Sequence, residues 1–441
     1  MDSGIKDALE QTSVESENLS RAEGTRTTRQ FSRAHSFSHR LLRSPLSAAC
    51  IVTGALLIAD GAAAQSAGAS QKGSQTPTVS APSSPQVFST PRKRSSGSFW
   101  TPERMRDAEP MDLPLVSPDE AGPMFMPESL PKTGESRREP GAPPSLDVAP
   151  DLDNWLFEPR EPEPELEPEA EPHSGATPSA TSSQGALFTD SRVFPREAVN
   201  AEPYRKAGKL FYYDPVQNLA YLCSASVIQR RLVVTAGHCV YDAEQGYWYT
   251  DFVFVPAYDE GAAAFGEWDA EQAFTTRSWI GGGGLVPNAG DFAILVMTDQ
   301  FVEGVGGEGQ AIGEVTGWLG WETDVVANSH VTMLGYPLNL DNGERLQQTT
   351  AQTFAVEQAS NVAEFGSGQG GGSSGGPFIL NFGEVAEGQD EPALNLVVGI
   401  KSYGFYGQDG LALRLAGTSI INGEFAELFD AACQATRGNC L

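Results

Sequence analysis

Three side chains with complementary chemistry lie at the ends of short apolar segments or in tight turns. His238 lies in TAGHC at residues 235–239, Asp291 lies in GDFAIL at residues 290–295, and Ser374 lies in GSSGGP at residues 372–377. A serine hydroxyl attacks a carbonyl poorly unless a base takes its proton, and that base needs a partner that fixes its tautomer. Imidazole suits the role of base because its free pKa is about 6.5. The sequence therefore predicts nucleophilic catalysis by Ser374, with His238 as general base and Asp291 as the orienting carboxylate.

The glycines around Ser374 meet a second chemical requirement, which is a set of donors for a developing oxyanion. Glycine lets the backbone turn tightly and approach closely, so the backbone N–H groups of Gly372 and Ser374 are expected to bind the oxyanion. Ser373 also fits a G-x-S-x-G pattern, but the Gly-Pro pair that follows favours Ser374 as the nucleophile.

The elements expected to position these groups are short β-strands. Apolar runs separated by Gly, Pro, Asn and Asp are typical of an all-β barrel or sandwich. Such runs occupy residues 209–213, 226–228, 231–235, 252–255, 292–297, 330–334, 378–380 and 396–401. One short C-terminal helix is predicted at residues 424–432, because Phe425, Leu428 and Phe429 fall on one face.

Composition divides the chain into three parts. Residues 1–64 combine a long basic region with an apolar run at 46–59 and an Ala-rich site before Gln65, which predicts a signal peptide; an uncleaved anchor is the alternative. Residues 65–187 are rich in Pro, Ser and Glu, so they are expected to form a disordered pro-segment or linker. Residues 188–441 are expected to form the folded domain.

Charge and cysteine content narrow the partners and the compartment. The net charge of −28 argues against nucleic acid as a partner, because phosphate binding needs a basic surface. Four cysteines remain beyond the signal, and an even set in an exported domain indicates two disulfides. Cys223–Cys239 with Cys433–Cys440 is the favoured pairing, and a zinc site is the rival. No metal or cofactor is expected, and the predicted location is extracellular or periplasmic.

The His and Ser motifs resemble those of the chymotrypsin-like serine peptidases, in which the base comes first along the chain and the nucleophile last. FVPAY at 254–258 and FGEW at 265–268 are similar to a stretch of the bacterial glutamyl-endopeptidase branch, and DSR at 190–192 resembles its N-terminal part. The resemblance covers about residues 190–430. It implies two six-stranded antiparallel β-barrels, at about residues 195–305 and 306–425, with the site in the cleft between them.

The same resemblance implies where a substrate would bind. Ser402, Tyr403 and Gly404 are similar to the strand that pairs with substrate backbone and lines the S1 pocket, and Ser402 is expected to reach Asp291. Lys401 falls where glutamyl endopeptidases carry a histidine that meets the substrate carboxylate. Either Lys401 selects Glu or Asp at P1 by charge pairing, or it points outward as a solvated charge.

Two departures from the family pattern affect activation and specificity. Ser373 stands where chymotrypsin-type enzymes carry an aspartate that pairs with a new N-terminal amine, so that activation switch is not expected. Gly368 falls where tryptic enzymes carry an aspartate, which argues against cleavage after Arg or Lys. The segment 365–370 lacks a cysteine that the branch often has, so a looser S1 wall is expected.

Together these patterns predict a secreted serine endopeptidase that acts through an acyl-enzyme on Ser374, with Glu or Asp at P1 as its suggested preference. A protein or peptide substrate, a monomeric state and no stable membrane span after signal cleavage are expected. The chain is expected to be a zymogen, from which the pro-segment is removed by cleavage near residues 191–193. The alternatives are a catalytically inactive homologue that acts as a binding module and an esterase, which the order of the three residues disfavours.

Overall fold

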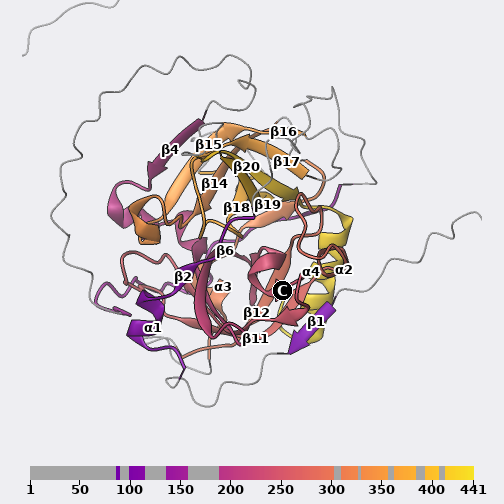
Figure 1. The fold of residues 1–441 in the computed structure, drawn as a ribbon. Coiled ribbons are helices and arrows are strands. Elements are labelled where there is room, and N and C mark those ends of the chain that lie inside the picture. Colours follow the sequence, from indigo (N-terminus) through magenta and orange to yellow (C-terminus); the bar gives the residue numbers. More distant parts are fainter. Residues whose placement is uncertain are drawn as a thin grey trace, which may run out of the picture. The chain divides into compact units, whose positions relative to one another are not determined.

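The computed structural model describes residues 86–89, 99–114, 136–156, 188–301, 309–325, 329–355, 362–383, 393–406 and 413–441. The chain divides into Met1–Thr76 and Pro77–Leu441, and every described residue belongs to the second unit. Its regular structure is mainly β-strand, as the sequence predicts (Figure 1). The predicted signal peptide lies outside the described residues.

Six antiparallel strands close into a barrel in the first half of the domain. They pair in the order β10-β5-β6-β7-β12-β11, and β11 pairs back to β10. Many of their side chains are apolar and fully buried, Phe211, Phe254 and Leu295 among them, so burial of apolar surface stabilises the closed barrel. The strands are β5 (Ala207–Asp214), β6 (Leu219–Gln229), β7 (Leu232–Thr235), β10 (Thr250–Pro256), β11 (Trp268–Thr275) and β12 (Ala293–Met297).

The second half of the domain is built on a larger, mainly antiparallel sheet. Six of its strands follow one another in the order β15-β14-β18-β19-β20-β17. Among the described residues no ladder joins β15 to β17, but β16 (Phe354–Ala355) pairs with β17 and follows β15 after Thr353 alone. The two end strands of this order, β15 and β17, are therefore connected through Thr353 and β16. The strands are β14 (His330–Gly335), β15 (Gln347–Gln352), β17 (Val362–Gly366), β18 (Pro377–Leu380), β19 (Leu396–Tyr406) and β20 (Leu413–Ile420).

Short elements complete the domain. The predicted C-terminal helix is confirmed as α4 (Gly423–Ala435), whose N-terminus is capped by the Asn422 side chain. Phe425 and Phe429 of α4 pack on Trp321, with ring centroids 5.3 and 4.9 Å away. The remaining elements are β4 (Phe188–Arg192), which pairs with β15; β13 (Gly320–Glu322), which pairs with β19; the hairpin of β8 (Tyr241–Asp242) and β9 (Tyr247–Trp248); and the helices α2 (Arg277–Gly281) and α3 (Ile312–Thr316).

Three parts of the range 65–187 are described by the structure and pair with the domain, so the prediction of disorder does not fit these parts. β1 (Gln86–Ser89) pairs with β11, β2 (Glu109–Pro110) pairs in parallel with β6, and β3 (Arg138–Glu139) pairs with β13. These segments have no hydrophobic period of their own. They add to strands whose open edges exist only once the domain has folded. Local sequence patterns therefore do not predict these pairings.

A buried ion pair joins the two halves of the domain. Lys209 of β5 is 1% exposed, and its Nζ lies 3.0 Å from Oε1 of Glu344, in the connection between β14 and β15. The Tyr258 hydroxyl donates to the other carboxylate oxygen, and the Tyr258 ring centroid lies 4.3 Å from Nζ. Desolvation lowers the pKa of Lys209, and the Glu344 carboxylate opposes that shift.

Replacing Glu344 with Gln should lower the free energy of unfolding by about 2 kcal/mol, because the Lys209 charge would stay buried without its partner. The double variant K209M/E344Q removes both charges and should recover most of that loss. Urea denaturation followed by tryptophan fluorescence measures both effects. A single variant as stable as the unchanged protein would show that the ion pair contributes nothing.

Candidate active site

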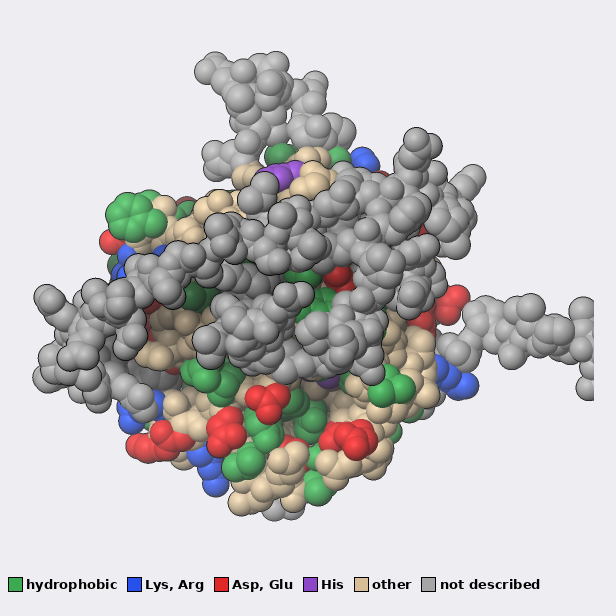
Figure 2. Space-filling view, turned by 45° about the horizontal axis from the view of Figure 1, so that its top comes forward, with side chains coloured by type: hydrophobic (Ala, Val, Ile, Leu, Met, Phe, Trp, Pro, Cys, Tyr) green, Lys and Arg blue, Asp and Glu red, His purple; other side chains and the backbone are tan. Residues whose placement is uncertain are grey.

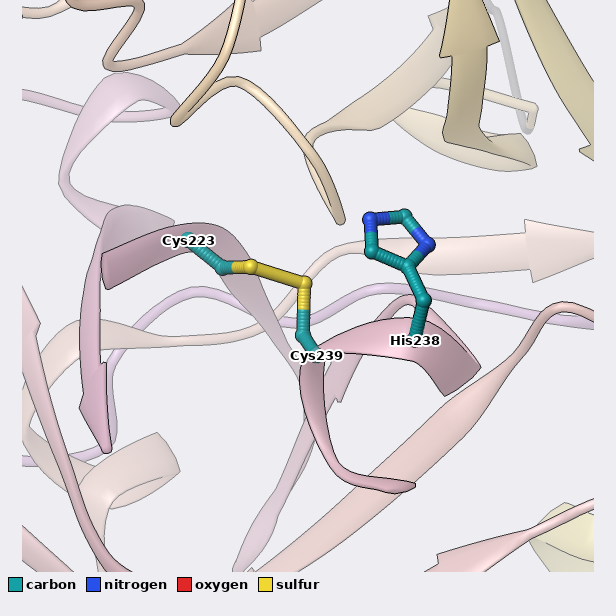
Figure 3. Close-up of side chains that lie close together, drawn as sticks. All are labelled: Cys223, His238 and Cys239. Carbon is teal, nitrogen blue, oxygen red and sulfur yellow. A yellow bond between two sulfur atoms is a disulfide. The ribbon is translucent and has the colours of Figure 1, made fainter. Parts of the chain in front are cut away.

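His238 is held by the end of a barrel strand and by a disulfide. It lies in the short 3-10 helix η3 (Gly237–Cys239), directly after β7 and Ala236. Cys239 is bonded to Cys223 of β6, and Figure 3 shows this disulfide beside the imidazole ring. Cys433 of α4 is bonded to Cys440, so the structure contains both of the favoured disulfides.

Three hydrogen bonds hold the carboxylate of Asp291. Its Oδ2 lies 2.8 Å from His238 Nδ1 and accepts the Ser402 hydroxyl at 2.6 Å, and its Oδ1 accepts the His238 backbone N–H at 2.8 Å. Asp291 is fully buried and lies just before β12, which pairs with β7 and so brings it beside His238. The contact between Nδ1 and Oδ2 fixes the orientation of the imidazole and leaves Nε2 at the far edge of the ring.

Ser402 reaches Asp291, as the resemblance implies, because β19 is bulged at this point. Lys401 pairs with Thr418 and Tyr403 pairs with Gly417, so Ser402 is an extra residue on its strand. A β-bulge bends the strand and changes the direction of a side chain. The second sheet therefore contributes a donor to a carboxylate that belongs to the first barrel.

The turn that carries Ser374 packs directly against the strand that leads to His238. The Ser374 carbonyl accepts the backbone N–H of Ser224, on β6, at 2.7 Å. Gly375 has a φ of +81°, and a Cβ there would lie 2.0 Å from Thr235 Oγ1 and 2.3 Å from the Ser224 carbonyl oxygen. Only glycine fits this turn, for reasons of both backbone conformation and space.

The hydrogen bond between Ser374 and His238 that the predicted triad requires is not formed in this structure. Ser374 Oγ and His238 Nε2 are both buried, and neither has a hydrogen-bond partner among the described residues. The structure thus brings together His238, Asp291 and Ser402, and leaves the hydroxyl of Ser374 unpaired. Catalytic hydrogen bonds are often long in the absence of a bound substrate. A buried polar atom without a partner costs about 1–3 kcal/mol, which favours pairing with an incoming reactive group.

Ser224, which the sequence analysis did not single out, fixes the predicted oxyanion loop. Its hydroxyl donates to the Gly372 carbonyl at 2.9 Å and accepts the Tyr336 backbone N–H at 2.9 Å. The N–H of Gly372 does not contact Ser224; it donates to the carbonyl of Met111 at 3.2 Å. A buried serine in an apolar strand was the only sequence signal for this role, and it does not identify the partners.

Replacing Ser224 with Ala should destabilise the protein by about 2 kcal/mol, because a buried carbonyl and a buried N–H lose their partner. Ser226 gives a matched control: it lies two residues along β6, and its buried hydroxyl has no partner among the described residues. S226A should therefore change the free energy of unfolding by less than about 0.5 kcal/mol. If S224A and S226A changed the free energy of unfolding equally in chemical denaturation, the hydrogen bonds of Ser224 would not contribute specially to stability.

Lys401 is fully buried, so the interpretation as an outward, solvated charge is wrong. Its Nζ lies 3.5 Å from the Gln369 carbonyl oxygen. Burial lowers the pKa of Lys401 to about 7, and the negative charge of Asp190 opposes the shift. A buried amine with this pKa changes its charge in the neutral range.

Asp190 of β4 places a carboxylate close enough to Lys401 to affect its pKa. Its Oδ2 accepts the Gly368 backbone N–H at 2.9 Å, and its Oδ1 accepts the Thr349 hydroxyl. A Cβ at Gly368 would lie 2.6 Å from Oδ2, so the bare glycine leaves room for this carboxylate. Burial raises the pKa of Asp190, and the hydrogen bonds and Lys401 lower it. In the sequence, Asp190 is recognisable only as part of a family-like segment.

The strand that resembles a substrate-binding strand is fixed at Tyr403. The Tyr403 hydroxyl donates to Glu364 Oε1 at 3.1 Å, and burial raises the pKa of Glu364 to about 7. A Cβ at Gly417 would lie 2.1 Å from the Tyr403 ring, so the ring occupies the space that a side chain on β20 would need there. The next residue, Gly404, donates its N–H to the Pro114 carbonyl at 3.1 Å.

Within the described residues, one group of His, Cys, Asp and Glu side chains is close enough to hold a metal ion. It consists of Cys223, His238 and Cys239, whose potential ligand atoms lie within 4.8 Å of one another. The two sulfurs are bonded to each other as a disulfide and provide no thiolate. This group therefore does not fit a zinc site.

The fold agrees with the family comparison. Residues 205–412 match the family model described as Trypsin, so this part of the chain resembles a trypsin-like serine peptidase domain and has a chymotrypsin-like fold.

The comparison with curated proteins gives a match to the "Extracellular metalloprotease" of Bacillus subtilis (strain 168). The identity is 22% over 194 residues, which are 42% of this chain and 54% of that protein. The chain thus spans about half the length of this relative.

Similar solved structures include the thermostable serine protease AL20 from an extremophilic microorganism (22% identity, 53% of this chain and 98% of that chain, TM-score 0.44). Protease Anisep from Arthrobacter nicotinovorans (25%, 52% and 94%, TM-score 0.42) and a Glu endopeptidase in complex with MPD (17%, 56% and 97%, TM-score 0.41) are also similar. With TM-scores below 0.5, these likenesses add nothing to the assignment.

Proposed function

We propose that this protein is a secreted serine endopeptidase that hydrolyses peptide bonds through an acyl-enzyme on Ser374. The observation that carries the proposal is the arrangement around the imidazole of His238. Its Nδ1 lies 2.8 Å from the buried carboxylate of Asp291, and the turn that carries Ser374 packs against β6 and against Thr235 of β7, the strand that leads to His238.

In the proposed mechanism Ser374 Oγ attacks the peptide carbonyl while His238 Nε2 takes the hydroxyl proton. Asp291 holds the ring and stabilises the imidazolium that forms, and the N–H groups of Gly372 and Ser374 bind the oxyanion. The imidazolium then protonates the leaving amine, which departs and leaves an ester on Ser374. A water molecule, deprotonated by His238, attacks that ester and releases the acid product and the free hydroxyl.

A fluorophosphonate probe should label Ser374 in the processed, folded protein, because it reacts with activated serines. S374A should abolish labelling, and D291N should slow it by about 10⁴-fold, since asparagine favours the wrong imidazole tautomer. The neighbouring Ser373, whose hydroxyl donates to the Gly370 carbonyl at 2.6 Å, provides a matched control, and S373A should still be labelled. The measurement is the rate of probe incorporation, with the modified residue identified by mass spectrometry.

The alternative function is that of a catalytically inactive homologue that binds a partner. The unformed hydrogen bond between Ser374 and His238 is the observation that favours it. Folded, processed protein that takes no probe at Ser374 would support this alternative and contradict the proposed enzyme.

We further infer that Lys401 sets a preference for Glu or Asp at P1. The support is the full burial of Lys401, whose Nζ lies 3.5 Å from the Gln369 carbonyl oxygen and forms no ion pair with a carboxylate among the described residues. A P1 carboxylate would supply that missing partner. Asp190 is a competing influence, because its own carboxylate lies close enough to affect the pKa of Lys401.

The ratio of kcat/KM for a Glu-P1 peptide to that for a Leu-P1 peptide should fall as the pH rises through about 7. Below this pKa Lys401 is an ammonium that attracts the P1 carboxylate; above it the amine is neutral and the attraction is lost. K401M should remove this pH dependence and lower the ratio by about tenfold or more. In D190N the loss should move to lower pH, because Asp190 raises the pKa of Lys401.

The Leu-P1 peptide serves as the internal control for changes in the catalytic groups themselves. Cleavage after Arg or Lys at rates above those for Glu would assign the specificity to Asp190 instead of Lys401. Equal cleavage of the Glu and Leu peptides by the unmutated protein would exclude both assignments.

Secretion is proposed from the predicted signal peptide and the two disulfides, which persist in oxidising compartments. No helix in the described parts of the chain is long and apolar enough to cross a membrane. In the face drawn in Figure 2, acidic side chains stand among hydrophobic ones, in keeping with a net charge of −28. A protein or peptide substrate is therefore proposed, and nucleic acid is not.

A further inference from the structure

A segment from the N-terminal region contacts Gly372, a proposed oxyanion donor, and Gly404, which belongs to the strand expected to pair with substrate. We call residues 99–114 the strap; they contain α1 (Pro102–Arg106) and β2. From the geometry of this segment we propose that the strap is a built-in inhibitor that occupies the substrate cleft with reversed chain direction. This inference rests on the proposed peptidase activity of Ser374.

The strap is anchored on the first barrel by apolar side chains. Trp100 is 7% exposed and Met105 is 4% exposed, and both belong to the main hydrophobic core. The indole N–H of Trp100 donates to the carbonyl of Asp251, on β10, at 2.6 Å. β2 pairs with β6, so this part of the strap lies along a strand of the first barrel (Figure 1). The start of the strap is therefore part of the packed structure.

Beyond its anchors the strap bonds to the two backbone donors that a substrate would need. The Met111 N–H donates to the Leu222 carbonyl at 2.9 Å, which continues the parallel pairing of β2 with β6. The Met111 carbonyl then accepts the N–H of Gly372 at 3.2 Å, and the Pro114 carbonyl accepts the N–H of Gly404 at 3.1 Å. Gly372 is a proposed oxyanion donor, and Gly404 belongs to the strand expected to pair with substrate.

The order of these contacts shows why the strap would inhibit and would not react as a substrate. A productive peptide places its scissile carbonyl at Gly372, and the residues before that carbonyl pair with the strand of Gly404. Its chain thus runs from Gly404 to Gly372. The strap runs the other way, because Met111 at Gly372 precedes Pro114 at Gly404. The leaving nitrogen of any peptide bond in it is then on the wrong side for protonation by His238.

Burial of the reactive groups agrees with an occupied cleft. Ser374 is fully buried, His238 is 6% exposed and Leu113 of the strap is 8% exposed. A Cβ on Gly371 would lie 3.1 Å from the Met111 carbonyl oxygen, and one on Gly372 would lie 3.4 Å from Cβ of Pro110. The strap thus lies directly on the glycine-rich loop. An endopeptidase must admit an extended polypeptide here, so the strap has to leave before substrate can bind.

The strap and a substrate compete for the same two N–H donors, which makes the inhibition reversible and competitive. Cleavage near residues 191–193, the expected processing site, would cut the covalent link but leave these non-covalent contacts intact. Activation therefore needs dissociation of the strap as well as cleavage. The rate at which the strap dissociates depends on the anchors at Trp100 and Met105. Release of the whole fragment also requires β1 and β3 to separate from β11 and β13.

The test uses the full chain with variants that weaken the strap and leave the proposed catalytic groups untouched. W100A removes an anchor, and L113D places a charge in the part that lies in the cleft. Each should raise the rates of fluorophosphonate labelling at Ser374 and of peptide hydrolysis by about tenfold or more. L152D is the matched control, since Leu152 is an exposed leucine of another N-terminal segment, with 59% exposure.

A second measurement does not depend on activity and keeps the proposal testable if W100A folds poorly. Hydrogen exchange of the Gly372 and Gly404 amides should be slow in the unchanged chain and in L152D, and about tenfold faster or more in L113D, because these amides lose their acceptors. Mass spectrometry of incubated, unchanged chain should find no cut within residues 109–114.

The outcomes separate the strap from the enzyme. Equal labelling rates in the unchanged chain, L113D and L152D would overturn the strap while leaving the peptidase in place. Autocleavage within residues 109–114 would contradict reversed binding. Faster amide exchange in L113D without labelling of Ser374 in any variant would show that the strap is bound but would refute the proposed activity, and the inhibitory role with it.

Discussion

The carboxylate of Asp291 is the group on which the site depends. A buried carboxylate is costly unless its oxygens receive hydrogen bonds, and Asp291 receives them from both halves of the domain. His238 contributes its ring Nδ1 and its backbone N–H from the first barrel, and Ser402 contributes its hydroxyl from the bulge of β19. Orientation of the base is therefore coupled to the association of the two halves. The Lys209–Glu344 ion pair secures the same association at another place.

Close backbone approach is the second constraint. The turn of Ser374 touches the strands of the first barrel so tightly that Gly375 has no room for a Cβ beside Thr235. Ser224 adds polar contacts across the same boundary, to Gly372 and to Tyr336. The position of the nucleophile is thus set by contacts between the two halves of the domain as well as by hydrogen bonds within its own loop. The glycines of the motif are therefore needed for the turn to pack against the first barrel.

The features that depend on nearby residues are recognisable in the sequence. The apolar strands and the helix α4 have a clear hydrophobic pattern, and the His and Ser motifs identify the family. The strands it missed, such as β15 with the sequence QQTTAQ and β11 with WDAEQAFT, have polar faces that resemble loops. The direction of Lys401 could not be read either, because the bulge at Ser402 breaks the alternation of faces. Asp190, Ser224 and the strap act through residues more than a hundred positions away, and no local pattern records such contacts.

The attachment of the strap to its own domain has a consequence for when the protein becomes active. A tethered ligand experiences an effective concentration set by its linker, often in the millimolar range, whatever the concentration of the protein. Once the linker is cut, the freed fragment obeys ordinary mass action and is lost by dilution. Molecules released into a large volume would then become active sooner than molecules crowded at their source. Cleavage would then be necessary but not sufficient, and the dissociation constant of the fragment would decide where activity begins.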